Sequence, residues 1–285
     1  MTASLEQSLP ELEILRRNWP GHESPTTTHP VVVRGVTIGG LDRTIIAGPC
    51  AVESFEQTLA VAQAAQAAGA HLLRGGAYKP RTNPHSFQGL GPAGLEILAE
   101  VRRRTGLGVV TEVLDPRLVE QVAAHADMLQ IGSRSMQNFP LLTEVGRTEV
   151  PVLLKRGFSA TLEEWLCAAE YVAQEGNRRI VLCERGVRTS CHWSYARSVL
   201  DLNILEPLRR LTPLPVVVDP SHSTGDWRLV LALSRAAIAA GAHGLVLEVI
   251  ESGADRRLLR SDAQQGVPPD VLEEIAAAAR GVVGA

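Results

Sequence analysis

Several chemically reactive side chains of this sequence end or follow a short apolar run: Cys50, Glu112, Lys155, His222 and Glu248. Thiol, imidazole and carboxylate groups can bind metal ions or move protons, and an ammonium group can bind an anion. Each residue type alone also occurs in ordinary structural roles. Their shared position at the ends of apolar runs indicates that the fold gathers them in one place.

A candidate metal site consists of Cys50, His222, Glu248 and Asp262. One thiolate, one imidazole and two carboxylates suit a borderline divalent cation such as Mn²⁺, Fe²⁺, Co²⁺ or Zn²⁺. Each residue has an ordinary alternative, since Cys50 could simply be buried, His222 could cap a helix and Asp262 could be exposed. The runs that carry the first three would be neighbours in a closed barrel, so we predict that all four residues share one metal.

Seven cations lie at the same ends of the runs: Arg74, Lys79, Arg81, Arg134, Lys155, Arg156 and Arg185. The first three belong to the glycine-rich stretch 74–91. Such crowding is unfavourable unless anions neutralise it, and arginine binds phosphate or carboxylate with paired hydrogen bonds. We therefore predict substrates with several negative charges. Arg156 is the weakest member of the group, because it could point away from Lys155.

Eight β-prone runs alternate with alanine- and leucine-rich amphipathic stretches. The runs occupy residues 44–50, 71–77, 108–113, 128–134, 151–157, 179–186, 214–222 and 244–250. Their number and continuous apolar character favour a (β/α)₈ TIM barrel, whose strand ends meet at one mouth. A doubly wound open sheet is the alternative, but no GxGxxG motif follows the first run.

The chain divides into a short extension and one large domain. Residues 1–30 form an N-terminal extension, which we expect to be partly flexible, with one amphipathic helix and a linker rich in Pro, Ser and Thr. Residues 31–40 contain two β-prone runs around a glycine and predict a small hairpin. We assign residues 31–285 to the barrel domain, including this hairpin.

The composition excludes several partners. The formal net charge of −3 gives no general attraction to nucleic acid or to an acidic membrane. No apolar run is long enough to span a membrane, and the N-terminus lacks a secretory signal. The four cysteines form no CxxC pair, so no disulfide framework is predicted. We therefore expect a cytoplasmic protein.

The polar ends of the runs lie in motifs that resemble those of a known enzyme family. The motifs are AGPCAVES, LRGGAYKPRTNPHSFQGLG, TEV, QIGSRSMQNF, PVLLKRG, LCERGVRT, DPSHSTG and LEV…SDAQQ. Together they resemble 3-deoxy-D-arabino-heptulosonate 7-phosphate (DAHP) synthase, in the short type I-beta subfamily related to 3-deoxy-octulosonate 8-phosphate (KDO8P) synthase. The resemblance implies a (β/α)₈ barrel that condenses phosphoenolpyruvate with erythrose 4-phosphate, the first step of the shikimate pathway to aromatic amino acids.

The resemblance also implies roles for individual residues. It implies the same four metal ligands, with Mn²⁺ as the first choice and Fe²⁺, Co²⁺ or Zn²⁺ as alternatives. It places Arg74, Lys79 and Glu112 at the reacting centre, where Lys79, a metal-bound water and Glu112 remain alternative proton carriers. The implied substrate-binding residues are Arg74, Lys79, Arg81, Thr82, Gln130, Arg134, Lys155 and Arg185.

Among these, Arg134, Lys155 and Arg185 would hold the phosphate of phosphoenolpyruvate, and Arg81 and Thr82 would bind erythrose 4-phosphate. The family resemblance further implies a homo-oligomer, a tetramer or a dimer.

The sequence departs from the family pattern at 248–250, which reads EVI in place of EVH, at the motif QIGSRS and at 190–197. Arabinose 5-phosphate as acceptor, a specialised-pathway paralogue and a non-catalytic anion-binding regulatory barrel therefore remain alternatives.

Overall fold

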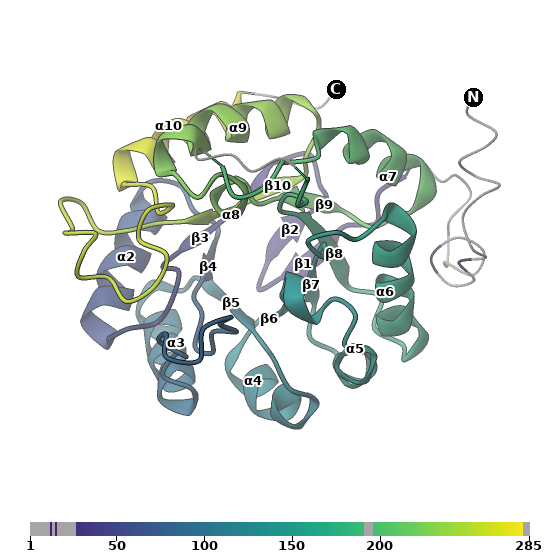
Figure 1. Cartoon of the computed structure of the whole chain (residues 1–285), viewed down its shortest axis with the longest axis horizontal. Helices are drawn as coiled ribbons and strands as arrows, with labels where there is room; N and C mark the ends of the chain where they lie inside the picture. The colour runs from purple at the N-terminus through teal and green to yellow at the C-terminus, as the bar shows by residue number, and fades with distance from the viewer. Residues whose placement is uncertain (1–11, 13–14, 16–26, 191–195, 282–285) are drawn as a thin grey trace.

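Eight parallel strands close into a barrel in the computed structural model, which describes Leu12, Leu15 and residues 27–190 and 196–281 (Figure 1). The strands are β3 (Thr44–Gly48), β4 (Leu72–Arg74), β5 (Gly108–Glu112), β6 (Met128–Ile131), β7 (Val152–Lys155), β8 (Ile180–Glu184), β9 (Val216–Val218) and β10 (Gly244–Glu248). β10 pairs with β3 and closes the barrel. The predicted (β/α)₈ fold is confirmed, and each predicted run contains one strand.

Helices surround the barrel, and most of them form its outer layer (Figure 1). They are α2 (Phe55–Ala67), α3 (Pro92–Thr105), α4 (Val119–His125), α5 (Phe139–Gly146), α6 (Leu162–Gln174), α7 (Leu205–Leu211), α8 (Pro220–Thr224), α9 (Trp227–Ala239) and α10 (Pro269–Arg280). Single 3₁₀ turns are η2 (Pro116–Leu118), η3 (Ser133–Ser135) and η4 (Leu202–Ile204). Local sequence sets where α6 begins, because Thr161 and Glu164 form a capping box. No helix of the described residues is long and apolar enough to cross a membrane.

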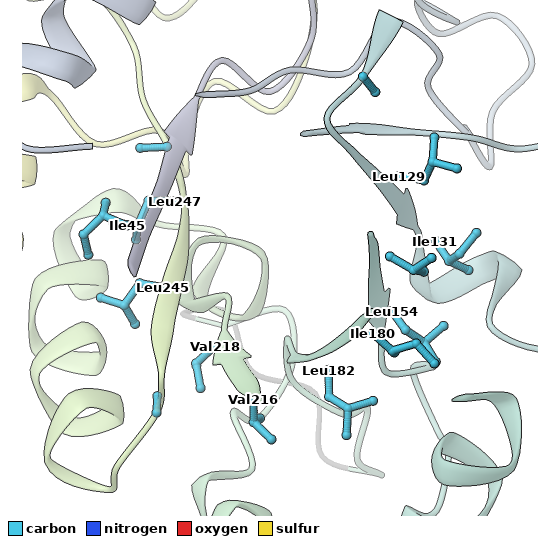
Figure 2. Close-up of a cluster of buried hydrophobic side chains, with 14 of the residues drawn as sticks. Ile45, Leu129, Ile131, Leu154, Ile180, Leu182, Val216, Val218, Leu245 and Leu247 are labelled. Atoms are coloured by element: carbon cyan, nitrogen blue, oxygen red, sulfur yellow. The ribbon is translucent and has the colours of Figure 1, made fainter. Parts of the chain in front are cut away.

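Strand side chains alternate between the helices and the barrel interior. Outward residues such as Ile45, Leu129 and Leu245 pack in the core beneath the helices (Figure 2). The lower inward layer is apolar and consists of Ile46, Leu72, Val110, Met128, Leu153, Val181, Val217 and Val246. Two positions further along lies what we call the upper layer: Gly48, Arg74, Glu112, Gln130, Lys155, Cys183, Asp219 and Glu248. The alternation that buries the core thus also gathers polar groups at the carboxyl end.

A hairpin covers the amino-terminal end of the barrel. β1 (Val31–Val33) and β2 (Val36–Ile38) pair antiparallel, as predicted for residues 31–40. Arg34 and Gly35 form the turn with φ of +46° and +82°, the left-handed pair that a two-residue hairpin requires. Inward residues of both strands pack against the lower layer. The lower layer is thereby covered, and the polar upper layer lies on the opposite side of it.

Part of the N-terminal extension contacts the barrel domain. Leu12 and Leu15 are buried in the outer core, and the Leu15 amide donates a hydrogen bond to Glu170 of α6 over 3.1 Å. Apart from these two leucines, the predicted helix lies outside the described residues, as do most of the predicted linker and most of the unusual segment 190–197. These two leucines show that the extension contributes apolar contacts to the core.

Candidate active site

A cavity of about 700 Å³ lies at the carboxyl end of the barrel, over the upper layer. Its volume is within the usual range for small-molecule sites. The predicted site residues that line it are Arg74, Lys79, Arg81, Glu112, Gln130, Arg134, Lys155, Arg185, His222 and Asp262. These side chains come from seven strand–helix units, and closure of the barrel brings the carboxyl ends of those units to a single mouth.

The candidate metal ligands form two contacting pairs joined by an arginine. Cys50 Sγ lies 3.4 Å from Asp262 Oδ2, and His222 Nε2 lies 3.1 Å from Glu248 Oε1. Arg74 joins the pairs, since it donates to Glu248 Oε1 over 2.9 Å and to the Cys50 carbonyl over 3.5 Å. In the described part of the chain, no three His, Cys, Asp or Glu side chains already form a tight metal cluster. The four residues are neighbours that a cation would have to draw together.

The chemistry of these groups fits a divalent cation. Burial, followed by the charge of Glu248, raises the pKa of the Cys50 thiol to about 12. Burial would also raise the pKa of Glu248, but His222 and Arg74 outweigh it and hold that pKa well below its ordinary value. A cation placed among these groups would favour the thiolate and complement the carboxylates. The donor set therefore suits the predicted metal.

Residues to which the sequence analysis gives no role hold the candidate ligands in place. Gln265 is fully buried, donates to Glu248 Oε2 over 2.6 Å and accepts from Arg197 over 2.7 Å. Asp219, at the end of β9, lies 2.7 Å from His222 Nδ1. Since a carboxylate only accepts, Nδ1 donates to Asp219, and Nε2, which faces Glu248 here, is the nitrogen that would bind a metal. The polar end of β9 signals Asp219, but no local pattern signals Gln265.

The glycine-rich stretch 74–91 folds back on itself beside the candidate ligands. Tyr78 and Gly89 form an isolated antiparallel bridge, and Arg81 donates to the Phe87 carbonyl over 3.2 Å. Arg81 also forms an ion pair with Asp262 at 3.1 Å. Thr82 is exposed and does not line the cavity, although its hydroxyl lies 3.4 Å from Arg134 Nη2. The stretch thus brings its cations to the cavity, with Thr82 at the edge.

The predicted phosphate-binding cations lie on the opposite wall of barrel strands. Lys155 is buried and pairs with Asp219 at 2.6 Å. Arg185 is also buried, and its nearest acceptors are the His222 carbonyl at 3.0 Å and the Ser198 hydroxyl at 3.3 Å. No carboxylate in the described part of the chain contacts Arg185 directly, and burial lowers the pKa of its guanidinium. Bound phosphate would supply the missing counter-charge.

Arg156 does not belong to this group. Its side chain donates to Glu184 at 3.0 Å and to Asp201 at 2.8 Å, and it does not line the cavity. Adjacent strand residues point to opposite faces, so a residue next to the inward Lys155 points outward. The alternative considered for Arg156 is therefore the observed one, and its role is a buried structural ion pair.

Glu112 and Lys79 are the predicted residues best placed to act on a bound substrate. Glu112 accepts from Gln130 over 3.1 Å through one oxygen, while the other, Oε1, is buried without a hydrogen-bond partner. A side chain at Gly132 would collide with this carboxylate, which explains the glycine. The Lys79 ammonium donates to the Cys50 carbonyl at 2.9 Å and contacts its sulfur at 3.2 Å. One group thus faces the cavity, and the other faces the candidate metal site.

Comparison with known proteins supports the family resemblance. The model of the DAHP synthetase I family matches residues 21–282. Phospho-2-dehydro-3-deoxyheptonate aldolase of Thermotoga maritima is 48% identical over 240 residues, which cover 84% of this chain and 70% of that protein. The crystal structure of a DAHP synthase from Thermotoga maritima has a TM-score of 0.85 and 44% identity, and the match covers 94% of this chain and 75% of that one.

Relatives of the octulosonate type are more distant in sequence. A 2-dehydro-3-deoxyphosphooctonate aldolase of Syntrophotalea carbinolica is 34% identical over 261 residues, which cover 85% of this chain and 91% of that protein. A truncated form of the Thermotoga maritima DAHP synthase matches with a TM-score of 0.81 and 42% identity, over 90% of this chain and 92% of that one. With its barrel, its cavity and a family match over most of its length, the chain belongs to the DAHP synthetase I family, whose members are transferases.

Proposed function

We propose that this chain condenses phosphoenolpyruvate with erythrose 4-phosphate to give DAHP and inorganic phosphate, and that the reaction depends on a divalent cation. The observation that carries this proposal is the shared cavity. Its wall includes His222 and Asp262, which contact the buried Glu248 and Cys50, and it also includes cations such as Arg185, which contacts no carboxylate among the described residues. A cation site and a phosphate site on one mouth suit a condensation between two phosphorylated substrates.

In the proposed reaction the methylene carbon of phosphoenolpyruvate attacks the aldehyde carbon of the acceptor. Water then adds to C2, and phosphate leaves with cleavage of its bond to carbon. Arg134, Lys155 and Arg185 would hold the donor phosphate, while Arg74 and Lys79 would face its carboxylate. These contacts leave the methylene carbon free and fix its approach, which is a large part of the rate advantage in such reactions.

The acceptor would lie between Arg81 and the candidate metal ligands. Arg81 would bind the acceptor phosphate, with the Thr82 hydroxyl at the edge of the cavity. When bound, the cation would polarise the aldehyde oxygen as a Lewis acid. Glu112 would exchange a proton through its carboxylate, because the residue lines the cavity and its oxygen Oε1 has no hydrogen-bond partner among the described residues. Lys79 is another candidate proton carrier.

A five-carbon acceptor, arabinose 5-phosphate, is the second candidate, and the relatives named as phosphooctonate aldolases favour it. The stretch KPRT at 79–82 favours the four-carbon acceptor, because octulosonate enzymes usually carry KANR there. The closer sequence relative also carries the heptonate name. Erythrose 4-phosphate is therefore the acceptor that we propose. The non-catalytic, anion-binding regulatory barrel is the alternative with the least support, since such a regulator would not need a metal site.

A phosphate-release assay tests this proposal. The purified chain is incubated with phosphoenolpyruvate and either aldose phosphate, with and without EDTA, and then with added Mn²⁺. We expect phosphate release with erythrose 4-phosphate, its loss in EDTA and its recovery with Mn²⁺. Turnover with arabinose 5-phosphate alone would reject the acceptor, and full turnover in EDTA would reject the metal requirement.

The cellular setting that we propose follows the family resemblance. We propose a cytoplasmic enzyme that assembles as a tetramer or a dimer and acts in aromatic amino acid synthesis, or in a specialised pathway that uses the same product. A sedimentation measurement on the full chain tests the assembly, because a monomer at micromolar concentration would contradict it.

A further inference from the structure

Three guanidinium groups surround one aromatic ring in the cavity. The Cζ atoms of Arg188, Arg185 and Arg134 lie 4.5, 4.8 and 5.2 Å from the centroid of the Phe158 ring. All four residues line the cavity. Phe158 follows β7, Arg134 follows β6, and the other two arginines follow β8. Loops from three neighbouring strands therefore meet on a single side chain.

Within the described residues, none of these three guanidinium groups contacts a carboxylate. Arg134 donates to the Thr82 hydroxyl, and Arg185 donates to carbonyls and to the Ser198 hydroxyl. The contrast with Arg156 is direct, because that side chain also approaches an aromatic ring but pairs with two carboxylates. Three cations around one ring repel one another, and an anion between them would remove the repulsion.

Phe158 is fixed to Arg188 through the backbone as well as through its ring. The Arg188 amide donates to the Phe158 carbonyl over 2.7 Å. An aromatic face attracts a cation and favours certain guanidinium orientations, without neutralising its charge as a carboxylate would. A ring at this place can therefore hold arginines in position and leave their donors available to a ligand.

We propose that Phe158 is a positioning residue for Arg134, Arg185 and Arg188, and that Arg188 is a further ligand of the donor phosphate. This inference rests on the proposed function, because it specifies how the phosphate of phosphoenolpyruvate is held. Arg185 approaches from the buried floor of the cavity, whereas Arg188 is exposed and approaches from its rim. Phosphate held from both sides would meet more donors than the three predicted cations supply.

Binding of phosphoenolpyruvate without an acceptor tests the inference. Calorimetry on Arg188→Gln and Phe158→Leu should show a dissociation constant raised about tenfold, the size expected for one charge-assisted hydrogen bond. Inorganic phosphate should compete less well in both variants by a similar factor. The conservative Phe158→Tyr should restore binding, because it keeps the ring. KM for erythrose 4-phosphate should change by less than about twofold, since a donor-site residue does not contact the acceptor.

The matched controls lie outside the cavity. Phe55→Leu removes a ring that Arg104 approaches to 4.8 Å between α2 and α3, and Arg103→Gln removes an exposed charge on α3. Both should bind phosphoenolpyruvate as the wild type does. Wild-type affinity in folded Arg188→Gln, or in folded Phe158→Leu, would overturn the corresponding half of the inference. Because this measurement needs no acceptor, a wild-type chain that fails to use erythrose 4-phosphate would reject the proposed function separately.

Discussion

Gln130 and Glu112 are neighbouring side chains at the same level of the barrel, and they have different roles because their surroundings differ. Gln130 and Glu112 lie side by side on β6 and β5, and Gln130 donates to one Glu112 oxygen. The second oxygen of Glu112 is buried without a partner, although such an atom is costly to leave unpaired. A bound substrate or an ordered water would satisfy it. We therefore propose this carboxylate as a proton carrier.

The variant Glu112→Gln isolates this function. It keeps the shape of the side chain but removes its capacity to accept a proton, so kcat should fall by about 100-fold or more, as for other general acid–base groups. KM for phosphoenolpyruvate should stay within about threefold, because no phosphate contact is lost. Steady-state kinetics measure both constants. Wild-type kcat in this variant would exclude Glu112 as the proton carrier.

Single residues were predictable where strand alternation fixes their direction. Glu112, Lys155 and Glu248 end buried strands, and the structure places each of them inward. Gln265 was not predictable, because it lies in an irregular loop where no period decides the direction of a side chain. Its contact with Glu248 depends on how the loop after β10 folds back, which only tertiary structure determines.

The number and order of the strands and helices could be predicted from the sequence, but their lengths could be predicted less well. The run at 214–222 contains the strand β9 but also the beginning of the short helix α8, which the sequence analysis does not predict. Five residues are too few to show a helical period. Asp219 is the N-cap of α8 and accepts from the His222 amide over 3.0 Å, while its other oxygen accepts from the His222 ring. One carboxylate thus begins the helix and orients the candidate ligand.

We predict that the hairpin at the amino end of the barrel contributes to the stability of the fold but not to the activity. Ile38 of β2 is fully buried against the lower layer. Ile38→Ala should lower the free energy of unfolding by about 2–4 kcal/mol through lost packing and the cavity that it leaves. Urea denaturation measures this loss, and kcat should be unchanged, because the upper layer lies on the far side of the lower layer.

Val32→Ala is the matched control on the same hairpin, since Val32 is 54% exposed. It should change the free energy of unfolding by less than about 0.5 kcal/mol. Equal losses in the two variants would show that the hairpin does not pack as described. A large loss of kcat in Ile38→Ala would show that the hairpin influences the cavity.

At the scale of the whole molecule, side chains that precede some strands bind backbone amides at the beginning of a neighbouring strand. His71 accepts from the Ile45 amide at 3.0 Å, and His243 accepts from the Val216 amide at 3.0 Å. Asp127 accepts from the Val109 amide at 2.8 Å. These contacts connect adjacent strands at the amino end of the barrel. The histidines can accept only when neutral, so barrel stability should depend on pH.

The pKa of His243 gives the pH range and the size of this dependence. Burial, followed by the charge of Arg209, lowers its pKa from 6.5 to about 4. The folded state therefore favours neutral His243, and its contribution is complete above about pH 6.5 and lost as the pH falls toward 4. The full loss would be on the order of 3 kcal/mol for a shift of this size. Burial also lowers the pKa of His71, so its contribution has the same sign.

His243→Asn keeps a hydrogen-bond acceptor and removes the titration. The difference in unfolding free energy between the wild type and this variant should shift in favour of the variant between about pH 6.5 and pH 4. Urea titrations at several pH values measure that difference, from which the common carboxylate effects cancel. A difference that stays constant over this range would contradict the assignment of His243 as a neutral acceptor.

Cobalt titration tests most directly whether Cys50, His222, Glu248 and Asp262 share one metal. The wild-type chain should bind one Co²⁺ and develop a near-ultraviolet thiolate-to-cobalt absorption band, because the Cys50 sulfur is one of the ligands. Cys50→Ser should lose that band, whereas Cys167→Ser, on the outer helix α6, should keep it. A band that survives Cys50→Ser, or a wild-type chain that binds no Co²⁺, would contradict the shared site.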